Sequence, residues 1–429
     1  MKVYFYSLGC KVNQYDTETL MEKFRLAGYT VCSDPEGCDV FVVNSCTVTA
    51  VSDQKTRQAV RRFKRQNPAA CVVLAGCMPQ AFPEKAESLL EADVIVGAKD
   101  QGQVVPLVEQ FFENNGTFDR SNVIAHEKGD IYENSSIYDF HGRTRAFIKI
   151  QDGCNRKCSY CIIPTARGRS RSRELDDLKA ELQTLLDAGF REVVLVGINF
   201  CCYGLDIGKT FVDPIELACS MGFERVRIGS LEFDNIKPDS IDRLAKLPNF
   251  CPQFHMSLQS GSDATLRRMY RNYDTAQYKN LCDKLRSTFP DCTITTDIMV
   301  GFPFESEENF EETISFAKEI GFEKIHVFPY SPREGTVAAE MTPQIAKSVK
   351  TERCHRMMAV ATEIRSDFLK KQIGSVFEVL AETFDGEYWT GYTRNYIPVK
   401  FRSPEDLHNK MVNVKITESD DENCFGTVE

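Results

Sequence analysis

The sequence predicts an α/β protein in three parts: an N-terminal doubly wound parallel sheet, a central partial (β/α)6 barrel and a small antiparallel C-terminal β-barrel. The length of 429 residues allows about three domains, at roughly 150 residues each. Short apolar runs alternate with helical stretches up to about residue 370, which is typical of parallel strands covered by helices on both faces. Beyond that point only short β segments follow one another, as in a small barrel.

The N-terminal part contains four apolar runs that we expect to be strands, at residues 3–7, 39–43, 71–75 and 94–96. Helical spacing follows two of them, at residues 16–27 and from about 52 to 66. These elements define an N-terminal domain at residues 1–115. The next segment, 116–140, is polar and aperiodic, and we expect it to be a linker.

The central part, expected at residues 141–370, has six further candidate strands separated by helices such as 176–188 and 307–320. The strands are expected at residues 147–150, 192–196, 225–228, 253–258, 293–300 and 324–328. This repetition of βα units predicts a barrel or partial barrel. The C-terminal domain, at residues 371–429, has β segments expected at 376–381, 388–394, 397–401 and 411–417.

The composition describes an ordinary globular protein with 42% hydrophobic and 27% charged residues. A net charge of -10 argues against a protein that coats nucleic acid indiscriminately, but it allows a local basic face. The N-terminus has no cleavable signal pattern and no apolar run could span a bilayer, so we expect a cytoplasmic protein with no membrane contact. Because disulfides are disfavoured in a reducing compartment, most of the 17 cysteines are expected to be buried thiols.

Three cysteines form the strongest motif, a C-x3-C-x2-C run of Cys154, Cys158 and Cys161 directly after the strand at 147–150. Thiolates are the usual ligands of iron–sulfur clusters, and three of them leave one iron of a cubane open to chelate S-adenosylmethionine (SAM). The motif matches the radical SAM superfamily signature, with Tyr160 as the aromatic residue before the last cysteine. Structural zinc is the alternative, but it needs a second knuckle, and none of the six histidines lies close to this loop.

Three other cysteines, Cys10, Cys46 and Cys77, each follow an expected strand of the N-terminal sheet. Parallel strands place their carboxyl ends at one edge, so the three thiols can converge there on one cluster. Gly9 and Gly76 would let the backbone turn sharply and approach a bulky group. The alternative is three unrelated buried cysteines. Cys32 and Cys38 do not fit the pattern, and Cys71 opens a strand and therefore lies at the opposite edge.

Over essentially its whole length the sequence resembles the radical SAM methylthiotransferase family. The matching stretches are LGCKVNQY at 8–15, NSCTVT at 44–49, GCNRKCSYCIIP at 153–164, SLQSGS at 257–262, TDIMVGFP at 296–303 and PYSPREGT at 329–336. The resemblance implies two [4Fe-4S] clusters, an auxiliary one on Cys10, Cys46 and Cys77 and a SAM-binding one in the central domain. It also implies that the C-terminal barrel is a TRAM domain, an RNA-binding module.

The resemblance further implies transfer of a methylthio group to C2 of the modified adenosine 3′ of the anticodon in a tRNA anticodon stem-loop. One SAM would methylate a sulfur at the auxiliary cluster, and a second would give the radical that takes hydrogen from C2. The electron donor would be a protein such as flavodoxin or ferredoxin. The residues around Cys10 and Cys46 most resemble those of the branch that acts on N6-threonylcarbamoyladenosine. Other branches act on isopentenyladenosine or on a ribosomal protein aspartate.

Two rival functions remain open at this point. One is a non-catalytic RNA-binding protein with structural metal. The other is a radical SAM enzyme whose auxiliary cluster only relays electrons.

SAM is expected across the carboxyl ends of the barrel strands. Polar residues follow three of those ends: Asn199, Ser230, Glu232 and Gln259. Together with Tyr160 they are the candidate SAM contacts, although they could equally satisfy loop backbone. The chain departs from the family at Cys201, Cys202 and Phe233, close to these contacts.

Two basic stretches are candidate RNA contacts. The segment 54–82 contains no acidic residue, and its candidates are Lys55, Arg57, Arg61 and Arg62. A solvated helix face is the usual alternative. Around the cluster loop the candidates are Arg167 and Arg169, which could instead pair with local acids, and Arg143 lies nearby. The aromatics of the C-terminal barrel, Tyr388, Trp389, Tyr392 and Tyr396, could stack on bases, but we expect each to be core.

Overall fold

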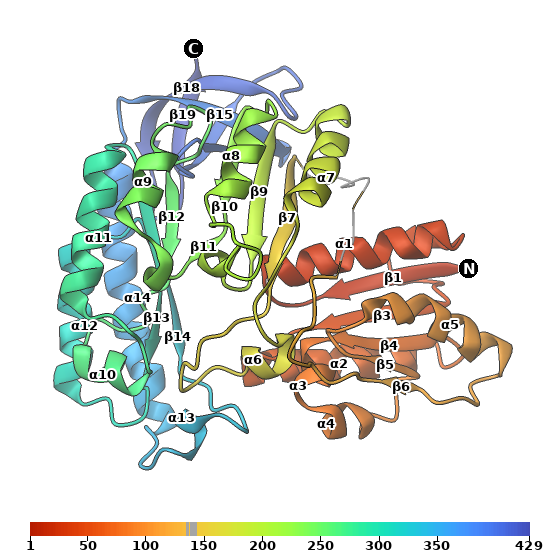
Figure 1. The fold of residues 1–429 in the computed structure, drawn as a ribbon. Coiled ribbons are helices and arrows are strands. Elements are labelled where there is room, and N and C mark those ends of the chain that lie inside the picture. The colour runs from red at the N-terminus through yellow and green to blue at the C-terminus, as the bar shows by residue number, and fades with distance from the viewer. Residues whose placement is uncertain (134–136, 138–143) are drawn as a thin grey trace.

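The computed structural model describes residues 1–133, 137 and 144–429 (Figure 1). The N-terminal domain is a parallel sheet with the strand order β2-β1-β3-β4-β5-β6. The strands are β1 (Lys2–Ser7), β2 (Thr30–Cys32), β3 (Val40–Ser45), β4 (Cys71–Gly76), β5 (Val94–Val96) and β6 (Ser121–Asn122). Strand β6 comes from the segment expected to be a linker; residues 134–136 and 138–143, including Arg143, lie outside the described part.

Helices cover both faces of this sheet, as a doubly wound fold requires. One core lies under α1 (Lys11–Leu26) and α5 (Val104–Glu113), and the other lies under α2 (Ala50–Gln66). Two short helices, α3 (Cys77–Ala81) and α4 (Pro83–Glu87), follow β4. Since both faces are covered, the strands read as unbroken apolar runs, and this is why the sequence predicted them.

The central domain is the predicted partial barrel. Its sheets have the orders β10-β9-β7-β8 and β11-β12-β13-β14, and only Gly229 separates β10 from β11 along the chain. The strands are β7 (Arg145–Asp152), β8 (Arg171–Ser172), β9 (Glu192–Gly197), β10 (Arg225–Ile228), β11 (Ser230–Leu231), β12 (Gln253–Met256), β13 (Thr293–Val300) and β14 (Lys324–Pro329).

Helices surround this barrel on its outer side (Figure 1). They are α7 (Leu175–Asp187), α8 (Asp213–Ser220), α9 (Pro238–Leu244), α11 (Thr275–Thr288), α12 (Glu307–Ile320) and α14 (Lys347–Lys370). Three short helices, α6 (Ile163–Arg167), α10 (Asp263–Arg268) and α13 (Val337–Glu340), lie in loops at the carboxyl ends of the strands. In the described part of the chain, no helix is long and apolar enough to cross a membrane.

The C-terminal domain is a closed barrel with the strand order β15-β16-β17-β19-β18. Its strands are β15 (Val376–Phe384), β16 (Trp389–Thr393), β17 (Pro398–Arg402), β18 (Met411–Ser419) and β19 (Cys424–Val428). The sequence did not predict β19, because that short strand is defined by its pairing with both β17 and β18. Trp389 is core, as expected.

Tyr392 and Tyr396 do not belong to the core of this small barrel, so the prediction was wrong for them. Their rings stack on each other at 4.5 Å between centroids and pack against Arg145 of the central barrel. Arg225 and Arg227 donate to backbone oxygens of the C-terminal domain at 2.9 and 3.0 Å. These contacts fix the C-terminal domain against the amino ends of the central strands.

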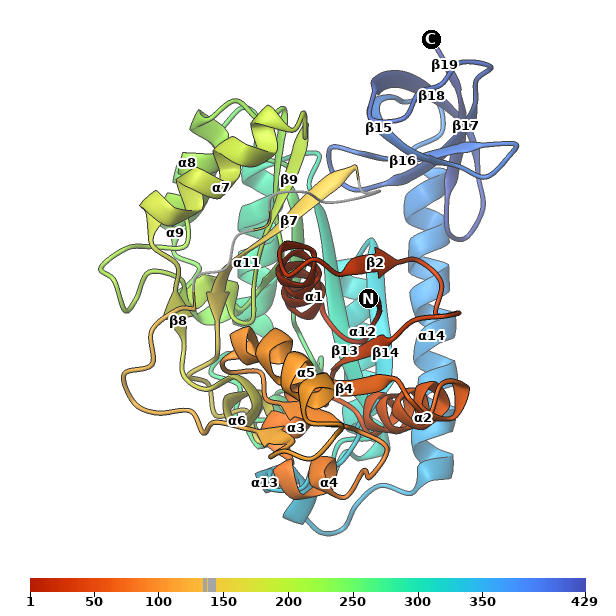
Figure 2. The ribbon, with the colours of Figure 1, turned by 90° about the vertical axis from the view of Figure 1, so that its right-hand side faces the viewer.

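The N-terminal domain packs on the central barrel through α1, which Figure 2 shows beside β7. Val12 of α1 forms an apolar cluster with Val194 and Val196 of β9. At a second contact, Arg333 donates to Thr47 at 2.7 Å and to Asp53 at 2.5 Å. The three domains therefore surround a shared interior space.

Candidate functional site

The cysteines Cys10, Cys46 and Cys77 lie at one edge of the N-terminal sheet. They follow β1, β3 and β4, which are adjacent and parallel, so their carboxyl ends meet there. Gly9 and Gly76 have φ angles of +110° and +97°, and a Cβ on Gly9 would lie 2.8 Å from Cys46 Cβ. Both glycines therefore allow sharp turns next to the cysteines, in a backbone conformation that other residues rarely adopt.

A buried arginine links this triad to the central barrel. The Arg167 side chain is 1% exposed, and its Nε donates to Cys77 Sγ at 3.1 Å. Its remaining nitrogens donate to Asp16 at 2.6 Å, Asp152 at 3.2 Å and Asn13 at 2.9 Å. Arg167 cannot reach an RNA phosphate from this position, so that prediction is corrected in favour of pairing with local acids.

The Arg167 guanidinium affects the protonation of two cysteines of this triad. Burial raises the pKa of the Cys77 thiol to about 12, and the Arg167 guanidinium opposes that rise. Burial also raises the pKa of Cys46. A neighbouring cation favours the thiolate form, and thiolates are what an iron–sulfur cluster binds. The donor set of three thiols beside one arginine therefore fits a cluster.

The second triad occupies the loop after β7. A Cβ on Gly153 would lie 2.0 Å from the Arg169 carbonyl oxygen, so the loop folds tightly back on itself. Nitrogen donors point at two of its sulfurs: Arg156 N and Asn199 Nδ2 lie 3.4 Å from Cys154 Sγ, and Arg271 Nη1 lies 3.5 Å from Cys158 Sγ. Burial raises the pKa of Cys161 to about 12, and Cys158 and Cys154 add to the rise because neighbouring thiolates repel each other.

All seventeen cysteines are described, and none forms a disulfide. Within residues 1–133, 137 and 144–429, no three His, Cys, Asp or Glu side chains are arranged to hold a single metal ion. Each triad consists of thiols only, which is the ligand type of iron–sulfur clusters.

The predicted SAM contacts lie next to the second triad. Asn199 Oδ1 and Gln259 Oε1 are buried, and neither has a hydrogen-bond partner among the described residues. Buried acceptors of this kind are rare in folded proteins and indicate a ligand that supplies donors, as the amine and ribose hydroxyls of SAM would. The residues present therefore fit SAM.

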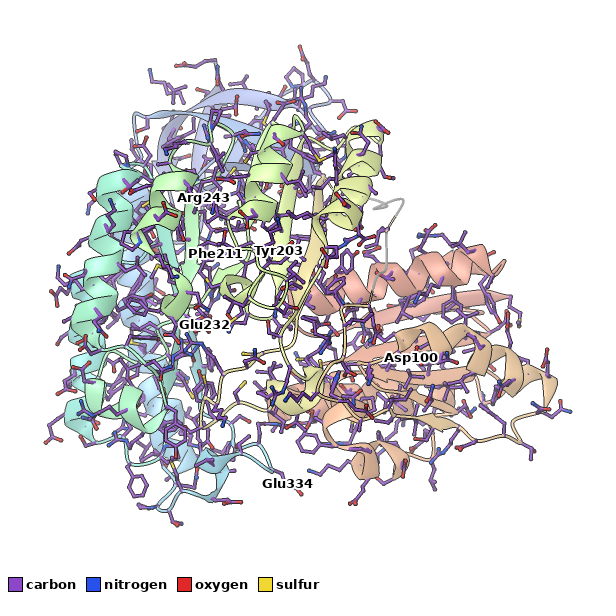
Figure 3. The ribbon with its side chains drawn as sticks, viewed as in Figure 1. Asp100, Tyr203, Phe211, Glu232, Arg243 and Glu334 are labelled. Atoms are coloured by element: carbon purple, nitrogen blue, oxygen red, sulfur yellow. The ribbon has the colours of Figure 1, made fainter. Side chains whose placement is uncertain are left out.

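The other three candidates have different surroundings. Glu232, labelled in Figure 3, forms ion pairs with Arg271 at 2.5 Å and with Arg156 at 3.8 Å. Ser230 is exposed on the wall of the interior cavity, and Tyr160 packs edge-on against Phe302. Sequence reasoning missed Arg271, since a lone arginine after a short helix carries no signal. The unusual Cys201 and Cys202 are buried beside this site.

A cavity of about 920 Å³ lies between the three domains. The N-terminal domain contributes Cys10 and Lys11, and the barrel contributes His255 and Asp297. The C-terminal domain contributes residues such as Tyr396. The cavity also reaches Ile163, two residues after Cys161. It therefore connects the neighbourhoods of the two triads.

The remaining candidate RNA contacts lie at the surface. On α2, Lys55, Arg61 and Arg62 are exposed and Arg57 is half-buried. Arg61 pairs with Glu91 at 3.3 Å, and Arg62 packs over Tyr6 and Phe63. Arg169 is exposed.

Comparison with known proteins gives two family matches. A family model described as "Radical SAM superfamily" matches residues 148–317, and one described as "Uncharacterized protein family UPF0004" matches residues 2–97.

Similar proteins match over nearly the full length of the chain. The threonylcarbamoyladenosine tRNA methylthiotransferase MtaB of Bacillus subtilis is 38% identical over 96% of this chain and 93% of its own length. The MtaB protein of Aquifex aeolicus is 35% identical over 97% of this chain and 100% of its own length. The tRNA-2-methylthio-N(6)-dimethylallyladenosine synthase of Carboxydothermus hydrogenoformans is 32% identical over 97% of this chain and 96% of its own length.

Among solved structures, the radical S-adenosylmethionine methyltransferase TsrM of Kitasatospora setae superposes with a TM-score of 0.57 at 13% identity. The superposition covers 77% of this chain and 73% of the TsrM chain. That likeness concerns the fold alone.

Proposed function

Because this chain belongs to the radical SAM methylthiotransferases, we propose that it adds a methylthio group to C2 of N6-threonylcarbamoyladenosine next to the anticodon of tRNA, using SAM and two [4Fe-4S] clusters. One observation carries the proposal: a cavity between the three domains is lined by Cys10 of one thiol triad and reaches Ile163, two residues after the last cysteine of the other triad. A methylthiotransferase needs one site that generates a radical and another that holds sulfur, both within reach of one base.

The chain's own residues have distinct roles in this proposal. Cys154, Cys158 and Cys161 would hold a [4Fe-4S] cluster, which would supply the electron for reductive cleavage of SAM when both are bound. Asn199 Oδ1 and Gln259 Oε1 accept hydrogen bonds from SAM, which fixes its orientation. The N–H groups of Asn199 and Arg271 orient the loop sulfurs.

On the opposite side, Cys10, Cys46 and Cys77 hold the auxiliary cluster, and Arg167 balances its thiolate charge. Helix α1 packs across β7 and β9, so it covers the side of the barrel and excludes water from the reacting base. The base must leave its stack to enter the cavity.

Substrate RNA would be held outside the cavity by exposed cations and by the C-terminal domain. The candidates are the α2 cations and Arg169, which would contact phosphates of the anticodon stem-loop. An electron donor such as flavodoxin or ferredoxin completes the system.

The threonylcarbamoyl substrate is favoured over isopentenyladenosine by the chemistry of the cavity. Its wall carries Lys11, His255, Thr295 and Asp297, which suit a hydroxyl- and carboxylate-bearing side chain. His255, Thr295 and Asp297 already pair with one another, so the difference lies at Lys11, which a hydrocarbon side chain would leave without an anionic partner at a cost of about 1–3 kcal/mol.

Nucleoside mass spectrometry tests the proposal. The anaerobically reconstituted protein is incubated with SAM, a chemical reductant and tRNA carrying N6-threonylcarbamoyladenosine, and the 2-methylthio derivative is expected. Isopentenyladenosine tRNA and a ribosomal protein serve as competing substrates. Product on either of these, and none on threonylcarbamoyladenosine, would refute the proposed substrate.

The triple variant Cys10→Ala, Cys46→Ala and Cys77→Ala tests the role of the auxiliary site. It should still cleave SAM to deoxyadenosine but form no methylthio product, because the cluster loop of the barrel is intact. A relay cluster would instead slow the cleavage itself. If the triple variant still methylthiolates tRNA, these cysteines are not the sulfur site.

A further inference from the structure

Three long-chain cations line the interior cavity: Lys11, Lys324 and Arg365. Two of them already have partners. Lys324 pairs with the Glu422 carboxylate at 3.7 Å, and Arg365 donates to the carbonyl oxygens of Glu422 at 2.6 Å and Glu323 at 3.1 Å. Lys11 Nζ, by contrast, has no hydrogen bond or ion pair with any part of the chain that the structure describes, and its one recorded contact is with the Phe147 ring.

The position of Lys11 is fixed by the fold. It is the first residue of α1, directly after Cys10, and Val12 anchors that first turn in the apolar cluster with β9. Its Nζ lies 5.7 Å from the centre of the Phe147 ring. The ammonium group lines the buried cavity, and the charged groups that act on it are Arg145, Arg227 and Glu192, of which Arg227 and Glu192 pair with each other at 2.9 Å. A bound anion would be attracted more strongly in this buried setting than in water.

Strands β12, β13 and β14 of the barrel contribute hydrogen-bonding groups to the cavity, and several of these already pair with one another. His255 contacts Thr295 Oγ1 at 2.9 Å and Asp297 Oδ2 at 3.2 Å, and His326 lies beside it with the ring centres 5.7 Å apart. Asp297 is already engaged with His255, so it does not neutralise Lys11. Among the described residues, the cavity thus contains one cation without an ion-pair partner, together with groups suited to hydroxyl and amide partners.

We propose that Lys11 binds the carboxylate of the N6 side chain of the substrate base and selects an anionic substituent over a neutral one. This inference rests on the proposed function, because the side chain in question is the threonylcarbamoyl group. Lys11 would be a specificity-determining residue placed one position from a cysteine of the auxiliary site.

Binding of short RNAs tests the inference. Anticodon stem-loops carrying threonylcarbamoyladenosine, its neutral methyl ester or unmodified adenosine are titrated against the anaerobically reconstituted protein by fluorescence anisotropy. A hydrogen bond to a charged group predicts that the wild type binds the carboxylate form about 10- to 100-fold more tightly than the ester. In Lys11→Gln this difference should vanish while affinity for the ester stays unchanged, and Lys11→Arg should retain most of the preference.

Lys324→Gln is the matched control, since it removes an already paired cation from the same cavity. It should affect the acid and ester RNAs equally. The inference is overturned if Lys11→Gln keeps the wild-type preference, or if it weakens all three RNAs alike, which would mean that Lys11 serves the phosphate backbone. The iron content of each variant is also measured. The inference is likewise overturned if Lys11→Gln loses iron and binds the three RNAs equally weakly.

The proposed function is judged separately, from the wild-type product on threonylcarbamoyladenosine RNA. Product from the wild type with an unaltered preference in Lys11→Gln refutes only the role of Lys11. Absence of product from the wild type refutes the proposed function.

Discussion

Arg167→Met should loosen the N-terminal domain from the barrel and lower the iron content at the Cys10, Cys46 and Cys77 site. The arginine joins the two domains inside the protein, because Asp16 and Asn13 lie on α1 while Asp152 ends β7. Methionine fills similar space but carries no charge and no donor. Cys77 Sγ would also lose its 3.1 Å hydrogen bond.

The magnitude follows from the charges in this cluster. Lys149 contacts the same two carboxylates, Asp16 at 2.6 Å and Asp152 at 3.2 Å, so two cations balance two anions in the wild type. Removing one partner of a buried pair costs about 3–5 kcal/mol. Because Lys149 remains, we expect the lower end, about 3 kcal/mol, which is on the order of 100-fold in an opening equilibrium.

Hydrogen–deuterium exchange measures this directly. Amides of α1 and α3 should exchange on the order of 100-fold faster in Arg167→Met, since exchange reports local opening. About half of the iron should be lost while SAM cleavage persists. Arg167→Lys, which keeps the charge but loses the donors to Asn13 and Cys77, should show a smaller change of about 1–2 kcal/mol.

Arg353→Met is the matched control. Arg353 is also buried, and it pairs with Glu305 at 2.7 Å; it belongs to α14, which packs on β14 and α12. Its loss should destabilise the contact of α14 with the barrel but leave iron content and α1 exchange unchanged. If Arg167→Met retains both wild-type iron and wild-type exchange in α1, the argument for this linkage is wrong.

Three further outcomes are expected. Burial raises the pKa of Glu323 to about 8, so the folded protein keeps this proton above the usual glutamate range while the unfolded chain releases it. The free energy of unfolding should therefore fall as pH rises from about 4.5 to 8, by up to about 1.4 kcal/mol per pH unit. Glu323→Gln should flatten the pH dependence of the urea midpoint, and equal pH slopes in the wild type and the variant would contradict this. Gln259→Leu should weaken SAM binding about 10-fold by calorimetry without changing iron content, and unchanged affinity would remove Gln259 from the SAM site. Replacing the four α2 cations, Lys55, Arg57, Arg61 and Arg62, by Ala should weaken tRNA binding and reduce its salt dependence, whereas an unaltered salt slope would indicate a merely solvated helix face.

Local sequence was enough to predict most of the fold. The strands at 225–228 and 293–300 and the helix at 307–320 occur as expected, because continuous apolar runs and helical spacing are properties of neighbouring residues. Strand β19 was missed because it exists only through its partners β17 and β18. The C-x3-C-x2-C loop was equally predictable, since its thiols are held together by the chain itself.

The sequence by itself thus determined the two thiol triads, the α/β architecture and the family. Only the tertiary structure decided what surrounds them. Arg167 and Arg169 are neighbours along the chain, yet one is buried against Asp16 and the other faces solvent. Lys11 reads as an ordinary surface residue but faces the cavity, because packing of Val12 on β9 turns the start of α1 inward. The physical reason is that charge and burial act through space, and the contacts that control them join residues 90 and 151 positions apart, as Arg167 does with Cys77 and Asp16.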